Sequence, residues 1–294
     1  MAKTRYLIVS GAMLLLLAGA AAYDNRQVLE TNGPGLRGGI HPAETIELGK
    51  PARHHSLVPS AIEAKVRGAY TISENDHVET PSGSAMNAIE ALLPSARSGD
   101  PKAALAIYSK LFSCRPEVDD SVIRSGIRAG EDDQQIAGHL ANHREECAGT
   151  AALLPERGRW LEAAAASGLP EAQLLYATDM EAIVGTREQI IRNPEKLMRY
   201  KARSSGYLKE LAATGNVDAM LALSSVYEHG TLVEQDPVRS YAYGRAAQLA
   251  IPSVIPHDML DRQRATLSPE HLAEGERLGR IIHSTCCNTP RKEP

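Results

Sequence analysis

Apolar and small residues recur at helical spacing over much of this chain, and one arrangement of them occurs three times. The arrangement is Ala-x-x-Gly-x-x-x-Ala-x-x-x-apolar, with small residues at fixed offsets around a glycine. Its copies are Ala96, Gly99, Ala103 and Ile107, then Ala165, Gly168, Ala172 and Tyr176, then Ala212, Gly215, Ala219 and Leu223. Small residues at these offsets let two helices approach closely on either side of a tight turn. The pattern therefore predicts an all-α protein built as an α/α solenoid of irregularly spaced helical hairpins.

The helical pattern extends over residues 85–285, which we expect to form the repeat domain. Asp100–Pro101 and Ser268–Pro269 each combine an N-cap side chain with a first-turn proline, so helices are predicted to begin at both places. The second start opens a closing helix over 268–283. A polar tail over 286–294 follows it.

The composition supports helices and argues against nucleic-acid binding. Hydrophobic residues make up 43% of the chain but aromatic residues only 4%, so alanine and leucine carry the apolar content, which favours close-packed helices. The formal net charge is −4, and no strongly basic stretch occurs. We therefore expect no nucleic-acid partner.

The N-terminus has the pattern of an export signal. Lys3 and Arg5 precede an uncharged run of 17 residues over 6–22, which ends in small residues. This length fits either a cleaved signal peptide or a retained N-terminal anchor, so residues 1–22 are assigned to one of the two. Residues 23–84 are rich in glycine and proline and lack periodicity, which predicts a linker of low order. The expected location is the periplasm, with membrane contact only through an uncleaved N-terminal segment.

The four cysteines fit an oxidising compartment. Three pairings are open, and we favour a disulfide between Cys114 and Cys147. Cys286 and Cys287 remain free, bonded to each other or bonded between molecules.

His139, His143 and Cys147 are the candidate metal ligands. They lie at i, i+4 and i+8, so they project along one side of a helix that we expect to begin near Glu131 to Asp133. A cysteine in a disulfide does not ligate as a thiolate, so this hypothesis and the favoured disulfide exclude each other.

No catalytic or cofactor-binding residue is identified. The chain contains no Gly-x-Ser-x-Gly element, phosphate-binding glycine loop or His-Glu-x-x-His motif. His54 and His55 lie in the irregular segment without a partner for acid–base chemistry. We therefore expect a protein that is not an enzyme and that needs no cofactor.

The third copy of the pattern resembles the Sel-one-like repeat, a relative of the tetratricopeptide repeat. The residues that match that family's unit in order are Ala212, Gly215, Ala219, Leu223, Tyr227, Gly230, Val233, Asp236, Ala242, Ala246 and Ala247. Residues 160–180 match half of the unit, and residues 96–111 match less of it. The sequence departs from the family in its irregular intervals and in Leu249, which stands where a further turn glycine is expected.

The resemblance implies a right-handed superhelix that binds proteins or peptides, in exported bacterial members often for envelope assembly, signalling or regulation. It supplies no catalytic residues. We therefore expect a non-enzymatic protein–protein interaction scaffold or adaptor in the bacterial cell envelope. The alternative is a helical metal-binding or enzymatic protein that uses His139, His143 and Cys147.

Overall fold

The computed structural model describes residues 68–72, 78, 81–255 and 257–287. Every described residue belongs to one compact unit of the chain, which lies within residues 58–294. The predicted signal or anchor, most of the predicted linker with His54 and His55, and the tail beyond Cys287 lie outside the described residues.

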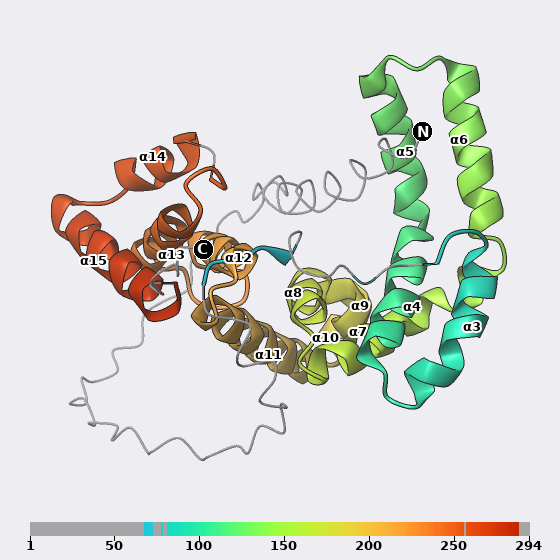
Figure 1. Ribbon diagram of the computed structural model, residues 1–294, viewed down its shortest axis with the longest axis horizontal. Helices are drawn as coiled ribbons and strands as arrows, with labels where there is room; N and C mark the ends of the chain where they lie inside the picture. Colours follow the sequence, from blue (N-terminus) through green and yellow to red (C-terminus); the bar gives the residue numbers. More distant parts are fainter. Residues whose placement is uncertain (1–67, 73–77, 79–80, 256, 288–294) are drawn as a thin grey trace, which may run out of the picture. The chain divides into compact units, whose positions relative to one another are not determined.

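The described part of the chain is helical (Figure 1). Its helices are α3 (Ala85–Arg97), α4 (Pro101–Ser113), α5 (Pro116–Ala129), α6 (Asp133–Glu146), η3 (Thr150–Ala152), η4 (Leu154–Glu156), α7 (Arg157–Ala166), α8 (Pro170–Thr178), α9 (Met180–Val184), α10 (Arg187–Arg192), α11 (Pro194–Ala213), α12 (Val217–His229), α13 (Pro237–Ala250), α14 (His257–Ala265) and α15 (Pro269–Cys286). Among the described residues the only β feature is an isolated parallel bridge between Tyr70 and Asn216. The predicted all-α class is therefore confirmed.

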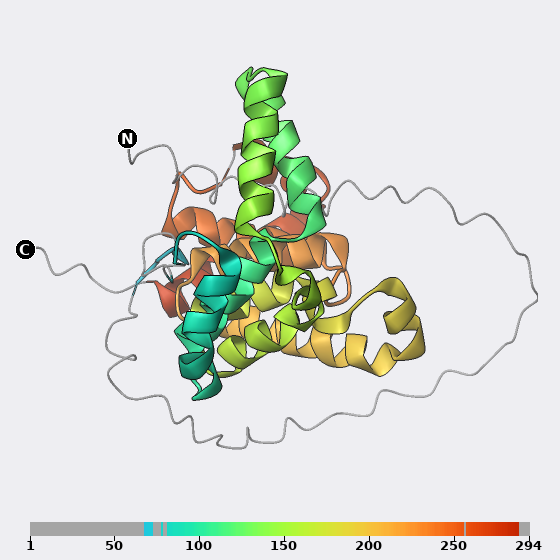
Figure 2. The ribbon, with the colours of Figure 1, turned by 90° about the vertical axis from the view of Figure 1, so that its right-hand side faces the viewer.

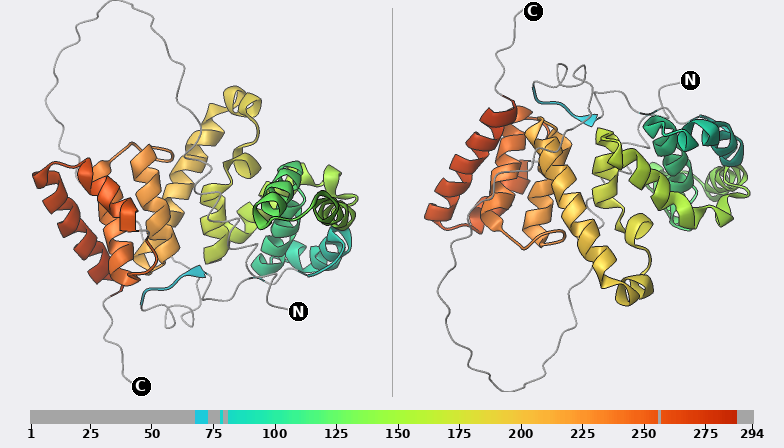
Figure 3. Two further views of the ribbon diagram at one scale, coloured as in Figure 1. Left: turned by 90° about the horizontal axis from the view of Figure 1, so that it is seen from above. Right: turned by 90° about the horizontal axis from the view of Figure 1, so that it is seen from below.

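Three helical hairpins follow one another along the chain, and each contains one copy of the sequence pattern. They are α3–α4, α7–α8 and α11–α12, and the two helices of each hairpin pack against each other. Successive hairpins are also in contact, because α4 packs on α7 and α8 packs on α11. The series continues from α12 to α13 and from α13 to α15, which lie alongside one another in Figure 3. This nearest-neighbour packing is that of an α/α solenoid, as predicted.

The repeated glycine is required by the backbone of each turn. The φ angle is +97° at Gly99, +84° at Gly168 and +95° at Gly215, a left-handed region that residues with a Cβ rarely adopt. In each turn the glycine N–H donates to the carbonyl of the signature alanine three residues earlier, at 3.0 to 3.2 Å. The N–H of the residue after the glycine donates to the carbonyl of the residue five positions before its own, at 3.1 to 3.4 Å. The turn thus satisfies the last carbonyls of the first helix and reverses the chain within a few residues.

The signature alanines form the seams between the paired helices. All six are buried: Ala96, Ala103, Ala165, Ala172, Ala212 and Ala219. The apolar position that follows is also buried in every copy, as Ile107, Tyr176 and Leu223. A larger side chain at a seam would hold the two backbones apart, so the seam alanines set the distance between the helices.

Insertions explain the irregular spacing of the three glycines. Helices α5 and α6 lie between the first and second hairpins and pack chiefly on each other, as Figures 1 and 2 show. Helices α9 and α10 lie between the second and third hairpins, and both contact α11. Each insertion leaves the contacts between neighbouring hairpins in place.

The residues beyond the third turn join α12 to α13. Gly230 ends α12 in a left-handed conformation, with φ of +66°. Asp236 caps α13 by accepting a hydrogen bond from the Arg239 N–H at 2.9 Å, and its own N–H donates to the Tyr227 carbonyl at 2.9 Å. Ala246 is fully buried in α13.

Leu249 stands where a fourth turn glycine was expected, and no turn occurs at that position. Helix α13 continues to Ala250, and Ile251 leaves it in an extended conformation. The next helix, α14, begins only at His257. Because the chain does not reverse within three residues, no left-handed residue is needed there.

The approach of α7 to α9 provides a test of this packing. A Cβ on Gly158 would lie 1.8 Å from the Ala182 carbonyl oxygen, so Gly158→Ala must move a helix backbone. We expect the free energy of unfolding, measured by urea denaturation, to fall by about 3 kcal/mol. The control is Gly138→Ala in α6, where an added Cβ meets nothing within 4 Å and alanine has the higher helix propensity. A Gly158→Ala variant as stable as the control would contradict the described contact.

Candidate functional site

The chain's own residues 68–72 lie against the third repeat turn (Figure 1). The Tyr70 N–H donates to the Gly215 carbonyl at 3.1 Å, and the Val217 N–H donates to the Tyr70 carbonyl at 2.9 Å. A Cβ on Gly215 would lie 2.5 Å from the Gly68 carbonyl oxygen, so this close approach requires a glycine in the turn. Two backbone hydrogen bonds therefore hold the segment against the turn, as in the addition of a strand to a sheet edge, and its Thr71 and Ile72 side chains are buried there.

Two acidic residues, each three positions after a turn glycine, accept hydrogen bonds from Ile72 and from Val78. Asp218 lies three residues after Gly215 and accepts a hydrogen bond from the Ile72 N–H at 2.7 Å. Glu171 lies three residues after Gly168 and accepts one from the Val78 N–H at 3.3 Å. Both carboxylates belong to the first turn of a helix, where the helix dipole favours negative charge.

The first repeat turn lies beside Val78 and carries an open depression of about 350 Å³. Its lining residues are Val78, Leu92, Ser95, Asp100, Lys102, Ala103 and Ala106. Here the position three residues after the glycine is Lys102, and Asp100 instead caps α4 by accepting from the Lys102 N–H at 2.9 Å. We call the surface formed by turns 99–102, 168–171 and 215–218 the turn edge.

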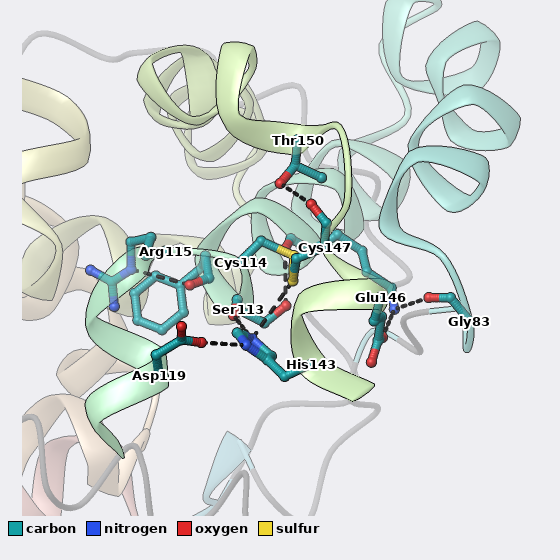
Figure 4. Close-up of a disulfide and its surroundings, with 11 residues drawn as sticks. Gly83, Ser113, Cys114, Arg115, Asp119, His143, Glu146, Cys147 and Thr150 are labelled. Carbon is teal, nitrogen blue, oxygen red and sulfur yellow. Dashed lines mark hydrogen bonds and ion pairs between the residues drawn. A yellow bond between two sulfur atoms is a disulfide. The ribbon is translucent and has the colours of Figure 1, made fainter. Parts of the chain in front are cut away.

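Cys114 and Cys147 are joined by a disulfide that connects the end of α4 to the end of α6 (Figure 4). This is the pairing favoured from the sequence. The bond closes the loop that contains the α5–α6 hairpin. Buried Lys110 strengthens the same junction, because its Nζ donates to Glu146 at 3.0 Å. The second disulfide joins the neighbours Cys286 and Cys287 at the end of α15, one of the outcomes left open.

The residues of the proposed metal stripe have other partners. His143 Nδ1 lies 2.9 Å from Asp119 Oδ1 and its Nε2 lies 2.8 Å from the Ser113 carbonyl oxygen, as Figure 4 shows. His139 is exposed and lies 3.5 Å from Glu131. Because Cys147 is in a disulfide, its sulfur is not a thiolate ligand. Among the described residues no cluster of three or more His, Cys, Asp or Glu side chains is arranged to hold a metal ion.

Asp119 is the electrostatic centre of the hairpin's base. It accepts a hydrogen bond from Arg144 Nε at 2.9 Å in addition to its contact with His143. The hydrogen bond from Arg144, followed by that from His143, lowers the pKa of Asp119 from its ordinary value of 3.8, although partial burial opposes the shift. The carboxylate thus links the start of α5 to the end of α6.

A buried polar cluster that the sequence pattern did not reveal joins the first two hairpins. The Tyr108 hydroxyl of α4 donates to Asp179 Oδ2 at 2.9 Å, and Arg157 Nε of α7 lies 3.7 Å from the same oxygen. All three side chains are buried. Burial, followed by the charge of Asp179, raises the pKa of Tyr108, so its hydroxyl remains a neutral donor. Arg157 occupies a position that helical periodicity alone does not distinguish from a surface site.

The packed hairpins define the class of protein, an α/α helical-repeat protein. No family model matches the chain, and no curated protein is significantly similar to it. Among solved structures it is similar to that of a protective antigen present in uropathogenic Escherichia coli strains and displaying an SLR fold. The two are 15% identical with a TM-score of 0.27, and the match covers 69% of this chain and 57% of that one. No helix in the described part of the chain is both long and apolar enough to cross a membrane.

The first prediction from this site concerns the Cys114–Cys147 disulfide. Its removal in Cys114→Ser/Cys147→Ser opens a loop with a sequence separation of 33, which costs about 4 kcal/mol in the free energy of unfolding by chain entropy. The control Cys286→Ser/Cys287→Ser removes a bond between adjacent residues, which restricts very little of the unfolded chain. Urea unfolding should show a large loss for the first variant and a small one for the second. Equal losses would contradict the role given to the long loop.

The second prediction concerns Asp119 and pH. Because its folded-state pKa is lowered, its contribution to stability is present above the ordinary value of 3.8 and is lost as the pH falls through the folded-state pKa. Asp119→Asn should therefore lose roughly 0.5 to 1 kcal/mol at pH 7, since Arg144 is largely exposed, and should match wild type at the acid end of the range. Urea denaturation between pH 7 and pH 2.5 measures this difference. The matched control is Asp120→Asn at the exposed neighbouring position.

Proposed function

We propose that this chain is a non-enzymatic interaction scaffold of the bacterial cell envelope, which binds a protein or peptide partner through its helical repeats. The observation that carries the proposal is the serial packing of three equivalent hairpins. Arrays of this kind present side chains and turns at regular intervals on an extended surface, which suits the recognition of another polypeptide. With a net charge of −4, specific contacts rather than bulk charge provide the affinity.

The buried polar groups support a structural role for the interior. Tyr108, Arg157 and Asp179 join the first two hairpins. In the last part of the domain, Gln263 Nε2 of α14 donates to Ser224 Oγ at 3.1 Å and to Ser240 Oγ at 2.9 Å. These groups hold helices together, and their burial removes them from contact with a partner on the surface.

Location in the envelope is supported by two independent features. The charged N-terminus and the uncharged run over 6–22 have the pattern of an export signal. The Cys114–Cys147 disulfide is of a kind that persists in oxidising compartments such as the periplasm. Mass spectrometry of the mature N-terminus distinguishes a cleaved signal, with a start near Ala21 or Tyr23, from a retained anchor.

Affinity capture of the tagged full chain from crosslinked bacterial envelopes tests the proposal. We expect one stoichiometric protein partner with the wild type. The variant Ala219→Leu, at a fully buried seam between α11 and α12, should lose it because the enlarged side chain separates the helices. The matched control is Ala141→Leu on the exposed face of α6, which should retain the partner. Capture of no protein, or equal capture by both variants, would contradict a repeat-borne scaffold function.

A further inference from the structure

We infer that the turn edge is a binding site for an extended peptide of the partner, and that residues 68–72 occupy this site within the same chain. The inference specifies the surface and the ligand class of the proposed scaffold, and therefore rests on that proposed function. The inference goes beyond the proposed function because it assigns recognition of the partner to the turns between paired helices.

Recognition at the third turn is directed at the main chain. Tyr70 contributes both its N–H and its carbonyl to the bridge with residues 215–217, and such contacts are available to any extended segment. Gly215 leaves the backbone accessible, since a Cβ there would lie 2.5 Å from the Gly68 carbonyl oxygen. The partly buried tyrosine side chain adds a hydrogen bond between its hydroxyl and that of Thr214. The identity of the occupant is thus weakly specified at this position.

Asp218 and Glu171 lie on the turns of two neighbouring hairpins, and each binds a main-chain N–H group in the same way. They accept main-chain N–H groups from Ile72 and Val78, which are six residues apart. An extended chain spans about 20 Å over six residues, and two packed helices at 8 to 10 Å each span about the same distance. One amide of an extended ligand can therefore meet one turn carboxylate per hairpin.

Side-chain specificity comes from two apolar positions. Ile72 is buried on the turn edge with an exposed fraction of 5%, so the ligand needs an aliphatic side chain at that position. Val78 lines the open depression beside the first turn, whose volume of about 350 Å³ leaves room for a larger side chain against apolar Leu92, Ala103 and Ala106. The expected ligand is an extended peptide with two apolar residues six positions apart.

Residues 68–72 mask this site because their attachment to the same chain gives them a high local concentration beside it. A tethered segment competes at an effective concentration on the order of 1 mM. If the tethered segment itself binds with an intrinsic Kd of about 10 μM, a free peptide binds roughly 100-fold more weakly to the wild type than to a chain whose own segment is displaced. The partner peptide must therefore bind better than residues 68–72 or arrive when they are detached.

The experiment uses the full chain and a fluorescent peptide of residues 66–80. The variant Ile72→Asp places a charge in the buried apolar position beside Asp218 and displaces the chain's own segment, whereas Ile127→Asp on the exposed face of α5 does not. Fluorescence anisotropy should show binding to Ile72→Asp at least 30-fold tighter than to wild type or to Ile127→Asp. Equal affinity for all three chains would overturn the inference.

A matched pair of glycine variants locates the peptide. Gly215→Ala and Gly99→Ala, each made in the Ile72→Asp chain, impose alanine at nearly the same φ, +95° and +97°. Only at Gly215 would the new Cβ meet the bound segment, because nothing lies within 4 Å of a Cβ on Gly99. Peptide affinity should fall at least tenfold with Gly215→Ala and remain unchanged with Gly99→Ala. Equal effects would overturn the assignment to the third turn.

Folding of the variants is checked by circular dichroism. If Ile72→Asp does not fold, Tyr70→Pro removes the N–H donor of the bridge and displaces the segment instead. Failure of both to fold would overturn the inference, because residues 68–72 would then be an essential part of the core. A negative peptide result leaves the partner-capture experiment unaffected, so failure of this site is distinguishable from failure of the scaffold function.

Discussion

Close approach of helix backbones across alanine seams is the constraint on which the rest of this structure depends. An alanine on each side of a left-handed glycine allows two helices to reverse and pack within four residues. Each hairpin so formed exposes apolar surface to the next, and the contacts of α4 with α7 and of α8 with α11 bury it. The core is therefore a chain of local contacts, into which segments are inserted without interrupting the series.

Much of the repeat architecture is predictable from the sequence because its determinants are local. The turn glycines, the Asp100 and Ser268 caps and the start of the helix with His139 each require only neighbouring residues to act. Leu249 is the exception, since a glycine is needed only where the chain reverses tightly. The copies of the signature do not show whether the chain turns there, and the structure shows that it does not.

The turn edge is much less predictable, for a physical reason. The contacts of Tyr70 with Gly215 and Val217 are made by backbone groups, which every residue carries, so they leave no pattern in residue types. Asp218 and Glu171 are detectable as acids in the first turn of a helix, but the helix dipole alone explains acids in that position. Residues 68–72 belonged to the predicted linker because a segment held by its main chain needs no periodicity. The buried Tyr108–Asp179 bond joins residues 71 positions apart and is equally invisible to local patterns.

The Cys114–Cys147 disulfide has a consequence for how this protein can vary. It fastens the two ends of the α5–α6 hairpin to each other at a fixed Cα–Cα distance of 5.3 Å, whatever lies between them. The chain enters and leaves the insertion at nearly one point, so the α5–α6 hairpin branches off the repeat series without interrupting it. Such a junction is a natural grafting position: a longer, shorter or differently charged module can replace α5 and α6 while α4 continues to pack on α7. Diversification of this protein, by evolution or by design, is therefore least costly between these two cysteines.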